Sequence, residues 1–464
     1  MIKNIAYAGI VMLAGMTMAA QDLCKASSEI NVEDECRLLI AGYRDAGRSR
    51  EDFASVEDVK AYLKKNPTIT GLALVHHASF PDQFPLDFLN DHPNVKTLIL
   101  RGKTGNPATF NLDRLQHITS FESGLYNDYL LIRFNFNIPG LVELGIPLRY
   151  FQTMAQGDMS ELRTLTLSPT RWLQDSCYSL SGIQKFNLRT LKIKTSQVRN
   201  TIELGLLSSL ECLEIECLGW GEEEFNFLRK LRGLKSLKVN YGSNMNLDVL
   251  EGLPLLESFE ISCLEAVKRP GYLEPLATLP SLKRLRLNSN GNLSDISVLS
   301  RCTGLVDLDF FHSQVSSIEA LRGRPLIRLI MSGSKVTDLS VLKDVPTLRL
   351  LDVSNTPQRI WQDWEGLRNH PSLQRIKAGD DDLSMETYIG RVARAAKGDQ
   401  QDFVHTPRFY PLEVLKTVPN LELVCAQPTR MPKAILEAFK QARPNVAFAD
   451  YGGWETRNLS EIVN

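Results

Sequence analysis

The sequence predicts an α/β solenoid in which one curved parallel β-sheet is built from repeats. Apolar residues recur at places 1, 4 and 6 of a short motif, where place 1 is the first apolar residue of each unit. The clearest copies begin at Leu282, Leu305, Leu326 and Leu348, which are 23, 21 and 22 residues apart. Alternating apolar residues indicate a strand. A fixed period indicates an array whose units bury their apolar sides against one another.

Weaker copies of the motif extend the array over residues 69–378. They begin at Ile69, Val95, Ile118, Leu141, Leu162, Leu188, Leu210, Leu234, Leu256 and Leu373. From Leu141 to Leu373 the starts are 21 to 26 residues apart, and chance does not produce such a period over so many copies.

The segments that return from one strand to the next indicate the type of repeat. Val315, Ile318 and Leu321 occupy places 11, 14 and 17 of their unit, and the next unit repeats this pattern. The pattern resembles the short leucine-rich repeat, roughly 22 residues long, of internalins and related bacterial proteins. This resemblance implies a horseshoe with irregular or 3₁₀ return segments that binds another protein. The asparagine typical of place 9 stands only at Asn290.

The beginning of the chain predicts export. Lys3 is followed by a largely apolar run from Ile5 to Met18 and by small residues at 19–20, as in a cleaved signal peptide. The run is short for a membrane span of about 20 residues. Residues 1–20 are therefore interpreted as a signal peptide of a periplasmic or secreted protein, with no stable membrane span after cleavage, and an uncleaved anchor is the alternative.

A helical cap is predicted over residues 21–68, because an array needs its first apolar side covered. The spacing of apolar residues predicts one helix over 31–41 and another that starts near Ser55 and ends before Pro67. Cys24 and Cys36 lie in this cap, and two states remain open for them, a disulfide or a reduced pair.

The array is interrupted after residue 378. Residues 379–420 are interpreted as a degenerate repeat or an insertion, and residues 421–464 as the last repeat-like strands with an irregular C-terminal cap. Within this cap we expect a helix from Pro432 to Ala442 and a last strand over 446–448.

Composition excludes several partners. The chain has 53 basic and 54 acidic side chains, so no basic excess points to nucleic acid.

No P-loop, GxSxG or HExxH motif is present. His76 and His77 are adjacent on a predicted strand and therefore point to opposite faces, which disfavours a metal site. We therefore expect no enzymatic activity, no cofactor and no metal site. A catalytic site within residues 379–419 remains a third possibility beside the two functions given at the end of this subsection.

Charged residues alternate in sign at place 5 of successive units. The series is Lys192, Glu214, Lys238, Glu260, Arg286, Asp309, Ile330, Asp352 and Lys377. Place 5 points to the concave face, and neighbouring strands lie about 4.8 Å apart, so each charge is expected beside two opposite ones. We interpret the series as a solvated ladder that fixes register; the alternative is a surface that recognises a charged partner.

Exposed aromatic residues are the candidates for binding. Phe311 at place 7 and His312 and Tyr241 at place 8 are expected at the ascending edge, where the strands enter the return segments. Trp172, Trp220, Trp361 and Trp364 are expected in the core. The predicted binding residues are therefore Tyr241, Arg286, Asp309, Phe311 and His312.

Together these features predict an exported, non-enzymatic module that binds another protein through its concave face and ascending edge. The alternative is a structural or carbohydrate-binding component of the cell envelope.

Overall fold

The computed structural model describes residues 38–41, 56–80, 86–104, 108–126, 132–135, 137–169, 178–196, 198–242, 244–262, 271–356, 361–378, 412–425 and 433–449. The chain divides into two compact units, Met1–Leu162 and Arg163–Asn464.

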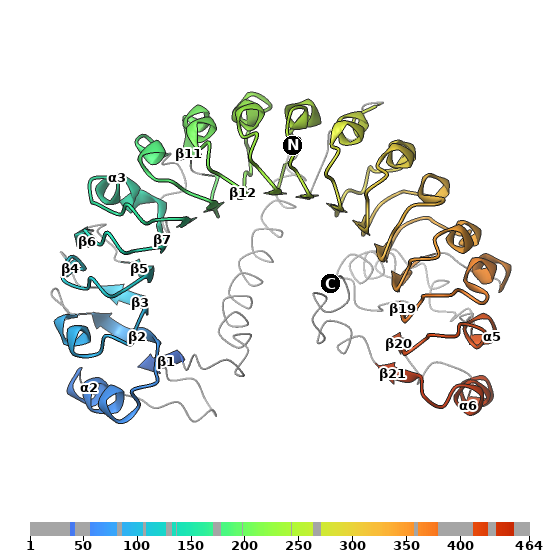
Figure 1. Cartoon of the computed structure of the whole chain (residues 1–464), viewed down its shortest axis with the longest axis horizontal. Helices are drawn as coiled ribbons and strands as arrows, with labels where there is room; N and C mark the ends of the chain where they lie inside the picture. Colours follow the sequence, from blue (N-terminus) through green and yellow to red (C-terminus); the bar gives the residue numbers. More distant parts are fainter. Residues whose placement is uncertain are drawn as a thin grey trace, which may run out of the picture. The chain divides into compact units, whose positions relative to one another are not determined.

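The first unit is built around short parallel strands. Among its described residues, five strands pair in parallel in the order β1, β2, β3, β5 and β7 (Figure 1). They are β1 (Leu38–Ala41), β2 (Gly71–Phe80), β3 (Thr97–Thr104), β5 (Ser120–Tyr126) and β7 (Glu143–Pro147). Two further strands pair separately, β4 (Ala108–Asn111) and β6 (Ile132–Asn135). The helical segments are α2 (Val56–Lys65), η1 (Asp87–Asp91), η2 (Leu148–Tyr150) and α3 (Phe151–Met154).

Of the two helices predicted before the first repeat, the second is present and part of the first is instead a strand. Helix α2 spans Val56–Lys65, as its apolar spacing predicts. Residues Leu38–Ala41, however, form strand β1, which pairs in parallel with β2 in the register Leu38↔Gly71. A short apolar run is compatible with a helix or a strand. Here it forms a strand, because pairing with the open edge of β2 satisfies its backbone hydrogen bonds. Cys24 and Cys36 lie outside the described residues.

The second unit repeats one strand and one return segment. Its described residues include twelve strands that pair in parallel in chain order. They are β8 (Thr164–Ser168), β10 (Thr190–Ile193), β12 (Cys212–Glu216), β13 (Ser236–Asn240), β14 (Ser258–Ser262), β15 (Arg284–Asn288), β16 (Asp307–Asp309), β17 (Arg328–Ile330), β18 (Leu350–Asp352), β19 (Arg375–Lys377), β20 (Leu423–Cys425) and β21 (Ala447–Ala449). A separate pair is β9 (Tyr178–Ser179) and β11 (Val198–Arg199).

Most return segments of this unit are 3₁₀ helices, as the resemblance implied. They are η3 (Ile183–Lys185), η4 (Thr201–Leu206), η5 (Glu223–Lys230), η6 (Leu247–Leu250), η8 (Glu274–Thr278), η9 (Ser297–Arg301), η10 (Glu319–Leu321), η11 (Ser340–Asp344) and η12 (Trp361–Leu367), followed by the α-helices α5 (Leu412–Leu415) and α6 (Lys433–Ala442). The strands of the unit line the inner side of a curved stack and the return segments its outer side (Figure 1).

The core of the second unit is a ladder of place-4 residues. The register aligns Leu191, Leu213, Leu237, Phe259, Leu285, Leu308, Leu329, Leu351, Ile376 and Val424 on consecutive strands. None of them is more than 2% exposed. The return segments close the core from the other side, because Val315, Ile318 and Leu321 are at most 1% exposed. The predicted repeat solenoid is therefore confirmed.

The long connection between β19 and β20 contributes no strand between them. Arg375 is in register with Leu423, so β20 pairs directly with β19 although 45 residues separate Lys377 from Leu423 in the sequence. Residues 379–411 lie outside the described residues.

Truncation of the place-4 ladder is expected to destabilise the whole second unit. Leu308 and Leu329 are fully buried on adjacent strands. Replacing either by Ala removes apolar contacts and leaves a cavity, and should lower the free energy of unfolding by roughly 2–5 kcal/mol. Denaturant unfolding of each variant measures this loss; a loss below about 1 kcal/mol would contradict the continuous core.

Candidate binding surfaces

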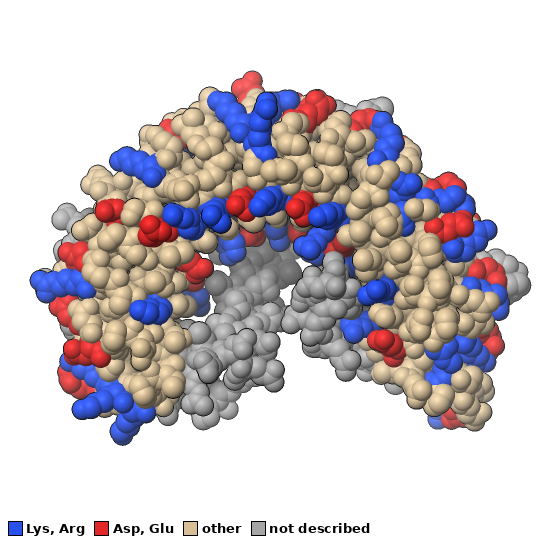
Figure 2. Space-filling view, viewed as in Figure 1, with Lys and Arg blue, Asp and Glu red and all other residues tan. Residues whose placement is uncertain are grey.

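The first candidate surface is the concave row of place-5 side chains in the second unit. The register places Lys192 beside Glu214, Glu214 beside Lys238, and Lys238 beside Glu260, and continues through Arg286 to Asp309. Lys238 Nζ lies 3.1 Å from Glu260 Oε1, and Arg286 Nη1 lies 3.7 Å from Glu260 Oε2. Figure 2 shows basic and acidic side chains alternating along the inner rim. The predicted ladder of opposite charges is confirmed.

A second charged residue per strand joins this row near β16, and sequence reasoning missed its role. Arg328, at place 3 of its unit, is the register partner of Asp307. Its Nη1 lies 2.5 Å from Asp307 Oδ1 and its Nη2 lies 3.3 Å from Asp309 Oδ2. The alternation at place 3, from Arg284 to Asp307 to Arg328, was the available signal.

The prediction that the whole concave face is solvated is wrong over β16–β18. The side chains of Asp307, Asp309 and Asp352 are only 6–11% exposed, whereas those of Lys238 and Arg286 are 39% and 34% exposed. The Arg328 guanidinium bridges two of these carboxylates, and the neighbouring Ile330 is itself buried. On the concave face, solvent therefore reaches the sheet before β16 more readily than β16–β18.

Burial and pairing have opposite effects on Asp309. Burial raises the pKa of the Asp309 carboxyl, while the Arg328 guanidinium and the backbone N–H of Phe311 lower it; burial prevails. The Phe311 N–H donates to Asp309 Oδ1 over 3.2 Å. Asp309 thus holds the turn that presents Phe311.

The second candidate surface is the ascending edge, where each strand turns into its return segment at place 8. Tyr241, Ser289, His312, Gly333 and Asn355 all occupy this place, with φ between 53° and 71°. The left-handed backbone keeps the inter-unit hydrogen bonds: His312 N donates to Ser332 O over 2.9 Å and Gly333 N to Ser354 O over 2.9 Å. Glycine and asparagine adopt this conformation most readily, and a tyrosine there is strained.

Phe311 and His312 form a compact aromatic pair on this edge. Their ring centroids are 4.1 Å apart at an interplanar angle of 89°, and both side chains are half-buried. The ring of His312 also lies over Gly333, because a Cβ built on Gly333 would be 3.2 Å from His312 Nδ1. The small residue of one unit therefore makes room for the ring of its neighbour.

The structure brings four of the five predicted binding residues together. Arg286 and Asp309 are register partners, and Phe311 and His312 lie two and three residues after Asp309. Tyr241 follows β13, three strands before β16, which corresponds to about 14 Å at a strand spacing of about 4.8 Å. Its side chain is half-buried on the same edge.

The other side chains singled out in the sequence do not add a site. Trp220 and Trp364 are buried, 5% and 4% exposed, as predicted; Trp172 and the side chains of Trp361, His76 and His77 lie outside what the structure describes. Cys212, Cys217, Cys302 and Cys425 are free thiols. In the described part of the chain, no cluster of His, Cys, Asp or Glu could hold a metal ion, and no helix is long and apolar enough to cross a membrane.

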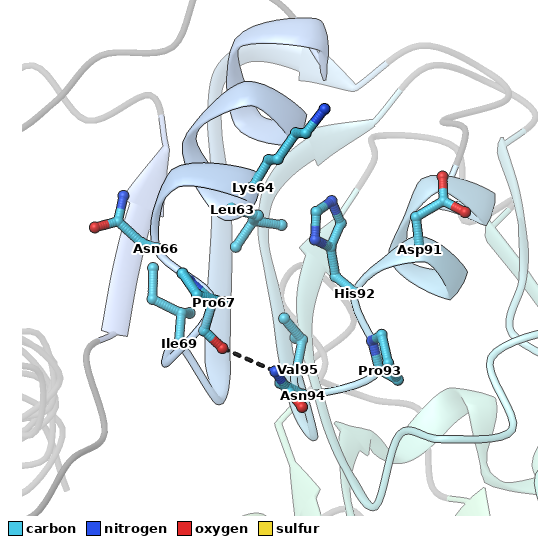
Figure 3. A pocket seen from close by; sticks show the side chains of 10 residues that line it. All are labelled: Leu63, Lys64, Asn66, Pro67, Ile69, Asp91, His92, Pro93, Asn94 and Val95. Carbon is cyan, nitrogen blue, oxygen red and sulfur yellow. Dashed lines mark hydrogen bonds between the residues drawn. The ribbon is translucent and has the colours of Figure 1, made fainter.

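A cavity of about 230 Å³ lies in the first unit, between the end of α2 and the loop before β3 (Figure 3). The buried Leu63, Ile69 and Val95 line it together with Lys64 and His92. Ligand pockets typically have roughly 300–1,000 Å³. We therefore interpret the cavity as a groove between neighbouring turns of the chain.

The repeat period, the strand register and the place-4 ladder decide the fold. The chain has the leucine-rich-repeat fold. Among solved structures it is similar to an internalin of Listeria monocytogenes, with 18% identity over 71% of this chain and 90% of that chain, and a TM-score of 0.39. A leucine-rich-repeat protein of Leptospira interrogans shares 13% identity over 86% of this chain and 100% of that chain, with a TM-score of 0.41.

A third similar structure is that of TLR13 in a complex with ssRNA13. It shares 15% identity over 79% of this chain and 54% of that chain, so the match spans about half of TLR13, with a TM-score of 0.49. A scan against protein-family models and a search of curated proteins found no match.

The concave row predicts an asymmetry between two substitutions of Lys238. Lys238→Glu places a carboxylate between Glu214 and Glu260, while Lys238→Gln only removes a charge. Because each cross-strand pair is worth roughly 0.2–1 kcal/mol, the Glu variant should be the less stable of the two, with a smaller difference at high salt. Thermal unfolding of both variants at low and high salt measures this. Identical melting temperatures at low salt would refute the register role of the row.

The buried carboxylate of Asp309 predicts a pH-dependent stability difference. A raised pKa in the folded state means that Asp309 favours folding most when protonated, and this contribution is lost as the pH rises through the folded-state pKa. Asp309→Asn keeps the size of the side chain and does not titrate. The melting temperature of the variant relative to the parent should therefore be higher at pH 7 than at pH 3.5. A difference that does not change, or that falls with pH, would show that Arg328 outweighs burial.

Proposed function

We propose that the chain is an exported binding protein that recognises another protein through the ascending edge and the solvated concave face of its second unit. The observation on which this proposal rests is Tyr241, a tyrosine held at φ 62°. Left-handed backbone costs a residue with a Cβ roughly 1–2 kcal/mol. Local strain of this kind concentrates at functional sites.

The fold itself does not require an aromatic residue at this place. Ser289, Gly333 and Asn355 make the same turn in other units, with φ of 54°, 71° and 55°. What the turn requires is a backbone N–H that reaches the next unit, as in Ser289, whose N–H donates to Phe311 O over 3.0 Å. The turn therefore does not account for the tyrosine side chain.

Protein recognition fits the chemistry of this edge. Half-buried aromatic rings and arginine anchor protein interfaces, and Phe311, His312 and Arg286 supply both at one place. The adjoining concave face, with alternating charges that remain partly exposed, can select a partner by charge pattern more than by affinity. The mosaic of both signs disfavours a nucleic acid.

Export is the part of the proposal that rests on the sequence. The apolar run after Lys3 and the small residues at 19–20 have the form of a signal peptide. We infer a periplasmic or secreted location, in which the binding surface meets partners outside the cytoplasm.

Replacing the strained tyrosine should change stability and partner binding in opposite directions. Tyr241→Asn introduces the residue that Asn355 already provides at the same place. It should stabilise the fold by up to about 1 kcal/mol, because asparagine tolerates this backbone, and should weaken partner binding at least about tenfold. Thermal unfolding and surface-immobilised binding assays measure the two effects.

Partners would be captured from envelope and host-cell extracts on the immobilised chain from Gln21, then identified by mass spectrometry. Tyr241→Asn and Phe311→Ala baits run beside the parent. Ile202→Ala is the matched control, because Ile202 is 66% exposed on η4, in a return segment away from the strands. One protein kept by the control and lost by both edge variants supports the proposal. Retention of the chain on isolated cell wall, with no protein captured, would establish the envelope component instead.

A further inference from the structure

A second charged row, separate from the concave face, runs along the edge of the sheet where the strands begin. It consists of the place-2 residues Arg189, Glu211, Lys235, Glu257 and Lys283, each of which directly precedes its strand. The backbone joins them: Glu211 N donates to Arg189 O, Lys235 N to Glu211 O, Glu257 N to Lys235 O and Lys283 N to Glu257 O, over 2.8–2.9 Å. We call these five residues the edge row.

The edge row alternates in sign at every step and remains exposed. Lys235 Nζ lies 2.8 Å from Glu211 Oε2, and Lys283 Nζ lies 3.1 Å from Glu257 Oε2. These four side chains nevertheless expose 35–57% of their surface, so solvent or a partner reaches each of them. Pairs exposed to this extent contribute little to stability. Stability alone therefore does not account for a row of five.

The spacing of the edge row limits what can bind along it. Its charges follow the strands at intervals of about 4.8 Å. A complementary partner must present alternating charges at the same interval over several steps, which a membrane or a nucleic acid backbone, with one sign of charge, does not do. A second copy of the chain has the same interval by construction.

A two-fold axis between β13 and β14 brings opposite charges together along the row. Such an axis sets Lys235 of one copy opposite Glu257 of the other, and Glu211 opposite Lys283, with each contact made twice, as in any isologous dimer. The apolar side chain next to this axis is Leu255, two residues before Glu257 and 47% exposed. An apolar centre with a charged rim is the usual anatomy of an interface. The formal net charge of −1 opposes self-association very little.

We propose that the edge row and Leu255 form a self-association surface, through which two copies of the chain make a reversible two-fold dimer. The surface lies at the start of the strands, whereas the proposed partner site comprises the ascending edge, where the strands end, and the concave face. The inference therefore stands or fails independently of the proposed function.

Charge exchange tests this pairing. Sedimentation velocity of the full chain should show concentration-dependent dimers that weaken roughly tenfold or more between low and high salt. Lys235→Glu alone sets two carboxylates against each other in the dimer, and Glu257→Lys alone sets two ammonium groups against each other. Each variant should dimerise at least about tenfold more weakly than the parent. An equimolar mixture should recover the parental affinity, because every contact between the two variants is again of opposite sign.

The mixture separates an interface from a loss of fold, since mixing does not repair damage within either chain. Lys238→Glu is the matched control: it makes the same charge change three residues further along the chain, on β13, and the folded variant should dimerise at the parental level. Leu255→Ser should weaken the dimer without charge reversal. A chain that stays monomeric at all concentrations, or a mixture of the two folded charge variants that associates no better than each alone, would overturn the proposal.

Discussion

The stability of the second unit depends on one constraint: its parallel strands pair so that equivalent places lie side by side. Each repeat has only a few backbone hydrogen bonds and one narrow apolar side. These are not sufficient to keep a single repeat folded by itself. Stacking in register aligns the place-4 residues from Leu191 to Val424 and removes them from water. A slip by one residue would turn every one of them to the solvated face. Stability, curvature and the position of each side chain therefore follow from one alignment.

The same alignment distributes charge by strand. From β10 to β15 each strand begins with one sign and repeats that sign at place 5, for example Glu211 with Glu214 and Lys235 with Lys238. Exposed pairs of this kind are individually weak. Their regularity sets opposite charges side by side in the correct order of strands, and like charges would meet if one strand were skipped. The result is two parallel charged rows, of which one faces the concavity and the other the edge where the strands begin.

At the ascending edge, the backbone conformation that the fold requires conflicts with the conformational preference of one residue. The turn at place 8 requires a left-handed backbone, and Gly333 and Asn355 satisfy it with residues suited to that conformation. Tyr241 adopts the same left-handed backbone, although a bulky side chain makes this conformation unfavourable. Departures from local rules at otherwise regular positions are expected at functional sites. The edge that bears Phe311 and His312 is for this reason the more informative of the two surfaces.

The sequence by itself determined the repeat period, the residues of the core, the alternation of charge and the edge position of the aromatic residues. These are periodic features, and each can be counted along the chain without knowing what lies opposite. It did not determine the strand at Leu38–Ala41, because a short apolar run becomes a strand only when an open edge such as that of β2 accepts its hydrogen bonds.

Only the tertiary structure decided which charged residues are buried and which backbone is left-handed. Arg328 bridges Asp307 and Asp309 because the register sets β17 beside β16, and the burial of these carboxylates depends on atoms far apart in the sequence. The strain at Tyr241 likewise arises from a turn that each unit makes to keep its hydrogen bonds with the next. Periodicity is local information, whereas burial and strain are properties of neighbours that only the folded stack brings together.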